Sequence, residues 1–369
     1  MRITMRQRLA AVGVSTLLIA GLAACSSDTG TSTTSNKPTV DQGFKIGLLL
    51  PESKTTRYES FDRPLIEAKL KELCPKCEIL YQNAAQDSAK QQSQAESMLT
   101  QGVKVLILDA VDATAAGGVV SNAQAQGVPV VAYDRLASGP ITYYVSYENK
   151  KVGETQGKAL LDAVSAGGDP KRGQIVMING DPTDPNAGDF KAGAHSMLDG
   201  KVNIGREYDT QEWSADNAQK EMEQAITALG KDQIIGVYAA NDGTAGGAIA
   251  AMKGAGFTTL PPVTGQDAEI AAIQRILTGE QAMTVYKAIK PEADAAAQMT
   301  IAAATGQGLS GLNTTNVNNK TADVPAVLLQ PVAVTKSNIK DTVIADGFYT
   351  PAQICTGQYA AACAAAGIS

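Results

Sequence analysis

The sequence predicts an α/β protein built from two doubly wound lobes with parallel sheets. Short, nearly continuous apolar runs alternate with longer amphipathic stretches, as buried parallel strands alternate with the helices that cover them. This pattern occurs twice, from Lys45 to Asp134 and again from Gln174 to Asp267. The chain of 369 residues is also long enough for two domains of ordinary size.

The expected strands are short and rich in Val, Ile and Leu, and each ends in polar residues. They lie at 45–50, 78–82, 103–108, 128–133, 174–178, 234–239, 263–264 and 283–286, with a late strand at 326–334. The expected helices lie between them at 60–73, 88–101, 113–126, 153–166, 215–229, 244–255 and 268–277. Gly102, Gly127, Gly230 and Gly256 follow four of these helices, where a left-handed C-cap residue is favoured. Residues 313–320 are expected to form a polar loop.

The first residues have the layout of an export signal. Arginines at positions 2, 6 and 8 precede an uncharged, apolar stretch over 9–24. The stretch ends in Leu22-Ala23-Ala24-Cys25, which resembles a bacterial lipobox. We therefore expect a signal peptide over 1–24, lipidation of Cys25 and a flexible tether over 25–43, with the protein exported to the outer face of the cell membrane. A non-lipidated signal or a short anchor with an incidental cysteine is the alternative.

The other cysteines are expected to form structural disulfides. Export leaves Cys74, Cys77, Cys355 and Cys363, an even number in an oxidising compartment. Three pairings are possible, and two local pairs are the simplest. Cys74-Pro-Lys-Cys77 is also the spacing of a redox or zinc motif, but no second ligand pair accompanies it.

Composition excludes several classes of function. Lys and Arg number 31 against 37 Asp and Glu, so the net charge of −6 offers no basic face for nucleic acid. His195 is the only histidine, which disfavours a metal site and catalysis by a histidine base. We expect no metal and no cofactor, and we interpret His195 as a surface residue.

Polar residues follow the predicted strands in both lobes. In open α/β sheets, ligands bind beyond the carboxyl ends of the strands, where these residues would converge. They are Glu52, Lys54, Arg57, Tyr58, Asp109, Asp134, Arg135, 179–186, Asn241, Asp242, Gln266, Asp267 and Lys287. Such a mixture of carboxylates, amides and cations suits a ligand covered in hydroxyls, which both donate and accept. Tyr58 and the sole tryptophan, Trp213, could pack on the apolar face of a sugar ring.

Several spaced blocks resemble the periplasmic D-xylose-binding proteins of ABC sugar importers. The resemblance covers about residues 44–347. Its blocks are Ala132-Tyr133-Asp134-Arg135, the run from Ala240 to Ile249, Gly265-Gln266-Asp267-Ala268, Met283-Thr284-Val285-Tyr286-Lys287 and Asn338 to Ile344. The resemblance implies a type I periplasmic binding protein fold, with two lobes joined by hinge strands. We expect one lobe over 44–142 and 288–325, and the other over 143–287 and 326–369.

The same resemblance implies which residues contact the ligand. They are Arg57, Tyr58, Asp134, Arg135, Asp184, Asn186, Trp213, Asn241, Asp267 and Lys287. Tyr58 stands where the family often has tryptophan, and Pro185 stands where it commonly has asparagine. The segment 52–56 differs most from the family pattern.

The resemblance implies capture without chemistry. The expected ligand is a free monosaccharide, D-xylose, which closes the lobes and is passed by a monomeric receptor to an ABC permease at the membrane. Another aldose, such as glucose, galactose or arabinose, feeding uptake or chemosensing, is the alternative. A glycosidase would need two carboxyls from among Asp134, Asp184 and Asp267, one with a raised pKa and one ionised. The cations and amides near these residues favour the ionised form of each and so disfavour a glycosidase.

Overall fold

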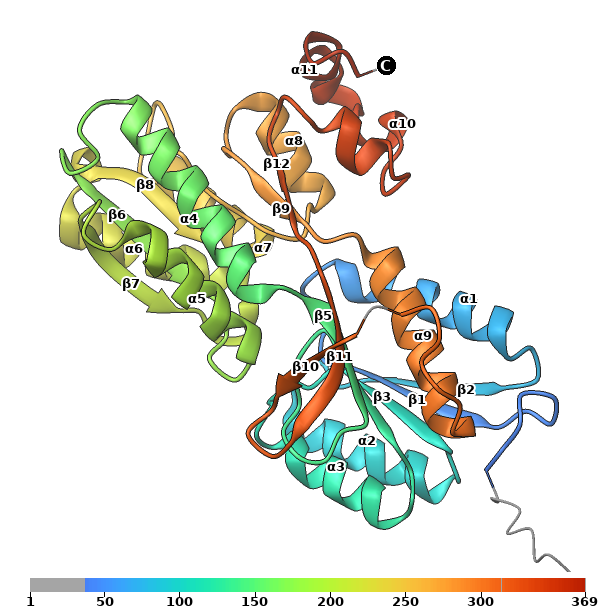
Figure 1. Cartoon of the computed structure of the whole chain (residues 1–369). Helices are drawn as coiled ribbons and strands as arrows, with labels where there is room; N and C mark the ends of the chain where they lie inside the picture. Colours follow the sequence, from blue (N-terminus) through green and yellow to red (C-terminus); the bar gives the residue numbers. More distant parts are fainter. Residues whose placement is uncertain (1–36, 313, 369) are drawn as a thin grey trace, which may run out of the picture. The chain divides into compact units, whose positions relative to one another are not determined.

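The computed structural model describes residues 37–312 and 314–368, so the predicted signal peptide and Cys25 lie outside the described residues. The first sheet has seven strands in the order β10-β11-β5-β4-β3-β1-β2 (Figure 1). Its strands are β1 (Lys45–Leu50), β2 (Glu78–Asn83), β3 (Val105–Leu108), β4 (Val130–Tyr133), β5 (Tyr143–Tyr147), β10 (Thr315–Asn318) and β11 (Asp323–Leu329). Only the edge strand β10 runs antiparallel to its neighbour in this sheet.

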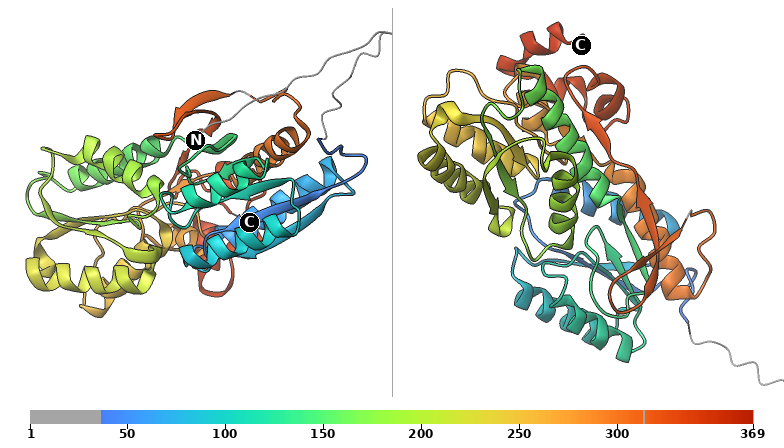
Figure 2. Two further views of the ribbon diagram at one scale, coloured as in Figure 1. Left: turned by 90° about the horizontal axis from the view of Figure 1, so that it is seen from below. Right: turned by 60° about the vertical axis from the view of Figure 1, so that its left-hand side comes forward.

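Helices cover both faces of this sheet, as in a doubly wound fold (Figure 2). The helices α1 (Arg63–Leu73) and α9 (Ile289–Thr305) bury their apolar residues against one face. The helices α2 (Ser88–Thr100) and α3 (Ala116–Ala125) cover the other face. The strands therefore lie between two apolar cores, which explains why β1, β3 and β4 are almost entirely apolar.

The second lobe repeats the arrangement around a smaller parallel sheet in the order β7-β6-β8. Its strands are β6 (Gln174–Asn179), β7 (Ile204–Asp209) and β8 (Ile234–Ala239). On one face lie α4 (Asn149–Ala166) and α5 (Pro185–Leu198), and on the other α6 (Ala215–Leu229) and α7 (Asp242–Gly254). Bridges from Val237 to Val263 and from Gln266 to Val285 connect β8 with β9 (Thr284–Tyr286), which pairs with β12 (Val332–Val334).

The C-terminal segment packs on α8 (Ile270–Thr278) of the second lobe. It contains the π-helical turn η4 (Lys340–Ile344) and the short helices α10 (Pro351–Ile354) and α11 (Ala360–Ala365) (Figure 1). A second π-helical turn, η1 (Tyr58–Asp62), precedes α1, and 3-10 turns lie at η2 (Gln211–Trp213), η3 (Lys231–Gln233) and η5 (Gly357–Tyr359).

The predicted α/β class and doubly wound sheets are confirmed, and several element assignments were wrong. Residues 315–318 form the edge strand β10, where a polar loop was expected; its side chains are polar because they are largely exposed. The strand β7 was missed because Arg206 and Glu207 interrupt its apolar pattern at a sheet edge. The helix α9 was missed because its core-facing residues are mostly alanines, which carry a weak periodic signal.

Two segments that were expected in the second lobe pair with strands of the first sheet. The strand β5 (143–147) pairs with β4 and β11, and residues 326–329 of β11 pair with β5. Both segments therefore lie in the first sheet, although they were assigned to the second lobe. The chain leaves this sheet after β5 and again after β11, which leads into β12 of the other lobe (Figure 1).

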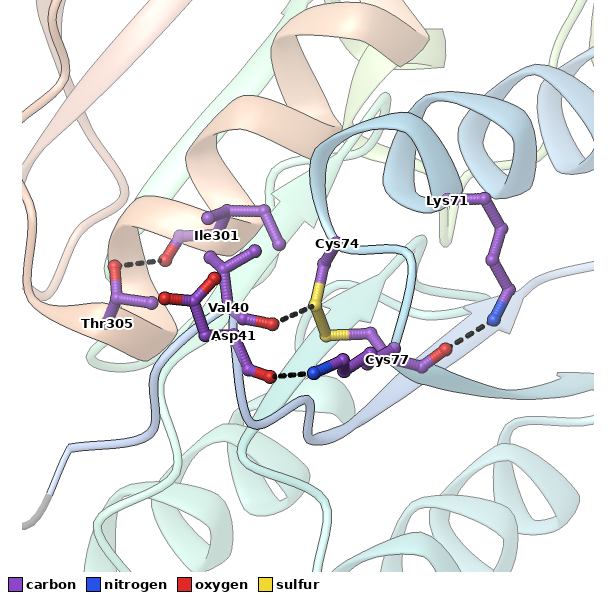
Figure 3. Close-up of a disulfide and its surroundings, with 8 residues drawn as sticks. Val40, Asp41, Lys71, Cys74, Cys77, Ile301 and Thr305 are labelled. Atoms are coloured by element: carbon purple, nitrogen blue, oxygen red, sulfur yellow. Dashed lines mark hydrogen bonds between the residues drawn. A yellow bond between two sulfur atoms is a disulfide. The ribbon is translucent and has the colours of Figure 1, made fainter.

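The disulfide between Cys74 and Cys77 lies beside the turn with which the described chain begins (Figure 3). Gln42 and Gly43 donate to the Thr39 carbonyl, and Lys76 donates to the Asp41 carbonyl. The Val40 side chain packs on the first core. Residues 39–43 thus belong to the folded body, so the expected tether is too long at its C-terminal end.

A second disulfide joins Cys355 and Cys363 in the C-terminal segment. Both predicted local pairs are therefore present in the structure. In residues 37–312 and 314–368, no helix is long and apolar enough to cross a membrane, and no cluster of His, Cys, Asp and Glu suits a metal ion.

The close packing of α4 on α5 depends on glycine. A Cβ on Gly193 would overlap the Lys150 carbonyl, so Gly193→Ala should push the helices apart and lower the free energy of unfolding by about 1 to 3 kcal/mol in urea titrations. Gly188 lies on the same helix with no neighbouring atom within 4 Å. Gly188→Ala, the matched control, should instead raise stability by about 0.5 to 1 kcal/mol, and equal effects of the two changes would contradict this account.

Candidate functional site

A cavity lies where the carboxyl ends of the strands of both lobes meet. Every residue that the sequence analysis assigned to the ligand lines it, together with three that it did not assign. The lining residues are Thr55, Arg57, Tyr58, Asp134, Arg135, Asp184, Asn186, Phe190, Trp213, Asn241, Gln266, Asp267 and Lys287. Thr55 and Gln266 come from the polar strand ends, whereas nothing in the sequence marked Phe190, a core-facing helix residue, as a cavity residue.

Arg57 is held by carboxylates of its own lobe. Its guanidinium donates to both oxygens of Asp62 at 2.6 and 3.0 Å, to Glu292 at 2.8 Å and to Asp134 at 3.3 Å. These bonds use four of its five N–H groups. The side chain is almost fully buried, so only one N–H, on Nη1, is left for a ligand.

Asp134 is the acceptor at the centre of the site. Besides Arg57, it receives a hydrogen bond from the Tyr58 hydroxyl at 3.2 Å, and Lys287 Nζ lies 3.6 Å away. Burial opposes its ionisation, but the positive charges of Arg57, Lys287 and Arg135 outweigh burial and lower the pKa of Asp134 below its usual range. Its backbone has φ of +54°, a conformation that costs free energy and is typical of functional sites.

Arg135 joins the two lobes. It extends from the first sheet, where its Nε lies 3.5 Å from Asp109, to Asp184 of α5, at 3.0 Å. Its other nitrogens donate to the Ala110 carbonyl and to the Tyr58 hydroxyl, each at 3.2 Å. Asn186 makes a second bridge, because its amide donates to the Asp134 carbonyl at 3.2 Å.

The local sequence explains the place of Asp184 and Asn186. Asp184 is the N-cap of α5 and accepts from the Asn186 N–H at 2.9 Å, while Pro185 takes the first helical position, where its missing N–H costs nothing. The other Asp184 oxygen accepts from the Trp213 indole at 3.2 Å. Burial raises the pKa of Asp184 to about 6 although Arg135 opposes the shift, so the group is ionised at neutral pH.

Lys287 and Asp267 supply the polar groups next to β9. Lys287 Nζ lies 3.4 Å from Asp267 and 3.6 Å from Asp134, so one ammonium lies between carboxylates of the two lobes. Asp267 Oδ1 is buried and has no hydrogen-bond partner among the described residues. A buried oxygen that makes no hydrogen bond is costly even beside an ammonium, so this atom is placed to accept a hydrogen bond from a ligand.

Aromatic rings form the apolar part of the cavity. Trp213 has φ of +51° and lies against Phe190, with ring centroids 6.4 Å apart. Gly180 lies directly behind the indole, and any Cβ there would overlap the ring. Asn241 completes this side: its oxygen caps α7 by accepting from the Thr244 N–H at 2.8 Å, so its amide nitrogen is the group it can offer to a ligand.

Several predicted strand-end residues have other roles. Glu52 accepts from the backbone N–H groups of Lys54 and Thr55 and shapes the turn after β1. Lys54 pairs at the surface with Glu212 of the other lobe. Asp109 is buried beside Arg135, and His195 contacts Asp199 and Glu207 on α5 and β7, partly exposed as expected.

The cavity is suited to binding rather than to catalysis. Three carboxylates and three cations line it, a balance that favours an uncharged ligand. A glycosidase needs a protonated carboxyl that can donate to the leaving group. Asp134 is held ionised, and both oxygens of Asp184 already accept bonds within the protein.

The two lobes and the polar cavity between them define a ligand-binding protein. The chain belongs to the periplasmic binding protein family, whose domain model matches residues 46–308. It is a binding protein and not an enzyme.

Named relatives resemble nearly the whole chain. This chain is 38% identical over 316 residues to the D-xylose-binding periplasmic protein of Escherichia coli (strain K12). The match covers 84% of this chain and 92% of that protein. The D-xylose-binding periplasmic protein of Haemophilus influenzae is 37% identical, with the same coverage. A solved structure of an ABC transporter solute-binding protein from Clostridium phytofermentans with bound β-D-glucose is 28% identical, with a TM-score of 0.77 over 84% of this chain and 99% of that one.

The raised pKa of Asp184 predicts a pH dependence of stability. Between pH 4 and 6 the folded protein keeps a proton that the unfolded chain releases, so this group stabilises the fold at about pH 4 and that contribution disappears as the pH rises to about 6. The change across this range should be about 2 kcal/mol in the free energy of unfolding. Urea titrations of the unaltered protein and of Asp184→Asn across this range measure it. If the free energy of unfolding changes with pH at the same rate in both proteins, the raised pKa of Asp184 is contradicted.

Proposed function

We propose that this protein captures a free monosaccharide, D-xylose, between its lobes and delivers it intact to an ABC permease. The observation that carries the proposal is the buried oxygen of Asp267, which makes no hydrogen bond among the described residues, in a charge-balanced cavity with aromatic rings. A sugar supplies hydroxyls that donate and accept, and an apolar ring face for stacking. A charged ligand would upset the balance of three carboxylates and three cations.

The relatives support this substrate class. Two of them are named for D-xylose, and solved structures of similar solute-binding proteins from Clostridium phytofermentans and Chloroflexus aurantiacus contain glucose. We choose D-xylose because the relatives of higher identity that cover most of this chain carry its name. Glucose is the competing ligand, and a panel of pentoses and hexoses in isothermal calorimetry separates the two.

Residues of both lobes contribute to the proposed site, so the sugar should favour the closed arrangement. Arg57, Tyr58, Asp134 and Arg135 come from the first lobe, whereas Asp184, Asn186, Trp213, Asn241 and Asp267 come from the second. Each lobe gains the other's hydrogen bonds only when the two are together. Closure also excludes water, so a sugar lacking one hydroxyl leaves a buried group unpaired and binds more weakly.

Contacts around the cavity fit such a closed arrangement. The Ala113 N–H donates to the Thr183 carbonyl at 3.2 Å, and the Thr183 hydroxyl donates to the Val111 carbonyl at 3.2 Å.

We propose lobe boundaries that follow the sheets, with 44–147 and 288–329 in the first lobe and 148–287 and 330–368 in the second. The links between them would act as the hinge.

We propose that Cys25 carries a lipid that holds the receptor at the outer face of the cell membrane, next to its permease. The support is the signal-like sequence over 1–24 and the lipobox-like residues before Cys25. We further propose that the receptor acts as a monomer, since one chain supplies both halves of the cavity. Metabolic labelling with a radioactive fatty acid tests the anchor, with Cys25→Ser as the control.

Asp267→Gly tests the sugar site. Glycine tolerates the φ of +87° at this position, so the fold should be preserved while the carboxylate is lost. We expect D-xylose affinity to fall by about 10- to 100-fold, since a hydrogen bond to a charged group is removed, with little change in the melting temperature of the free protein. Calorimetry and thermal unfolding measure the two effects. The exposed Asp232→Asn should change neither, and unaltered affinity in Asp267→Gly would remove this residue from the site.

The ion pair between Lys54 and Glu212 should slow sugar release. It joins the lobes at the surface, with each side chain about half exposed, so it is worth less than about 1 kcal/mol and is screened by salt. Lys54→Met should speed the dissociation of the sugar by up to about fivefold at low salt. It should also remove most of the salt dependence of that dissociation rate. Stopped-flow fluorescence measures the rate. The control Lys158→Met breaks an exposed pair within α4 and should leave the rate unchanged, whereas equal effects would exclude a role for the pair across the lobes.

A further inference from the structure

An aromatic cluster lies behind the sugar site and includes residues of both lobes. Its members are Phe61, Tyr286, Phe348 and Tyr349. Phe348 stacks on Phe61 with ring centroids 4.2 Å apart and planes at 25°, and Tyr286 lies 5.1 Å from Phe348. Among the described residues of this apolar cluster, only Phe61 comes from before Ala268 in the chain.

Phe61 belongs to the turn that carries the first-lobe binding residues. In η1, Tyr58 and Asp62 are buried and make hydrogen bonds at the site, whereas Phe61 is partly buried and faces the C-terminal segment. Arg57 precedes this turn and is held by Asp62 through two hydrogen bonds. The turn is π-helical, with a bond from the Arg63 N–H to the Tyr58 carbonyl, a geometry found often at functional sites.

Tyr286 lies next to a binding residue in the chain, as Phe61 lies in the turn with Tyr58. It directly precedes Lys287, the ammonium between Asp134 and Asp267. Phe348 therefore packs on Phe61, which lies in the turn with Tyr58, and on Tyr286, which directly precedes Lys287. A shift of Phe348 would be transmitted to both sides of the cavity.

The Cys355–Cys363 disulfide lies in the segment that carries Phe348. The Phe348 N–H donates to the Val343 carbonyl at 3.0 Å, and Gln274 of α8 donates to the Ile354 carbonyl at 3.0 Å. Cys363 is buried in the same apolar cluster, and Cys355 packs against it. The disulfide joins the end of α10 to α11, so it limits how far these two helices can move apart in the segment that packs with Phe348.

We propose that Phe61 and Phe348 are positioning residues for the sugar site, and that the Cys355–Cys363 disulfide maintains sugar affinity by holding Phe348 in place. The inference rests on the proposed function. Reduction of this disulfide would loosen the support of Arg57 and Lys287 without removing any group that touches the sugar. The Cys74–Cys77 disulfide lies beside the N-terminal turn and α9, at the opposite end of α1 from η1 and in the first core rather than in this cluster, and provides an internal control (Figure 3).

Four variants of the full chain test the aromatic contact and the disulfide. They are Phe61→Leu, Phe348→Leu, the double variant of these, and the paired change Cys355→Ser with Cys363→Ser. Trp213 is the only tryptophan of the chain and lines the cavity, so its fluorescence reports D-xylose binding directly. We expect each of the four to weaken binding by about 3- to 10-fold, mainly through faster dissociation. The double variant should lose no more than the worse single variant, because both remove one stack.

The outcomes separate the inference from the proposed function. Cys74→Ser with Cys77→Ser should leave the affinity unchanged even where it lowers the melting temperature. If the aromatic and Cys355–Cys363 variants lower the melting temperature but bind D-xylose like the unaltered protein, the residues are merely structural and the inference is wrong. If the unaltered protein binds no monosaccharide, the proposed function fails instead. Multiplied losses in the double variant would contradict a shared contact.

Discussion

The structure depends on the burial of two arginines. Arg57 and Arg135 are almost completely removed from water, and a buried cation is stable only where carboxylates and hydrogen bonds replace its hydration. The carboxylates come from η1, from α9, from the residue after β4 and from the N-cap of α5, which are distant in the chain. These elements must therefore be placed correctly before either arginine can be buried, which ties the arrangement of both sheets to the site.

Hydrogen bonds within the protein also prepare the site for its ligand. Four of the five Arg57 N–H groups are used within the protein, so this side chain is rigid before any ligand arrives. A rigid donor loses little entropy on binding, which favours affinity. The backbone contributes to this preparation, since Asp134, Trp213 and Asp267 all have positive φ values that the surrounding packing has to stabilise.

Support for the binding residues extends beyond the residues that line the cavity. Gly180 allows the indole of Trp213 to approach the backbone closely, and the Asp184 cap fixes the start of α5. The aromatic stack between Phe61 and Phe348 extends the same support to the C-terminal segment. The affinity of such a receptor is therefore a property of the folded body and not of the contact residues alone.

Patterns in the sequence were enough to predict the α/β class, most strands and helices, and ten of the thirteen residues that line the cavity, and they favoured the local cysteine pairs. These follow from local patterns, because buried parallel strands are apolar and their carboxyl ends carry the polar residues. Three features became visible only in the folded protein: β5 and all of β11 join the first sheet, Phe190 lines the cavity, and Phe61 packs on Phe348. Such contacts join residues far apart in the chain, where apolar side chains look alike and packing alone selects the partner.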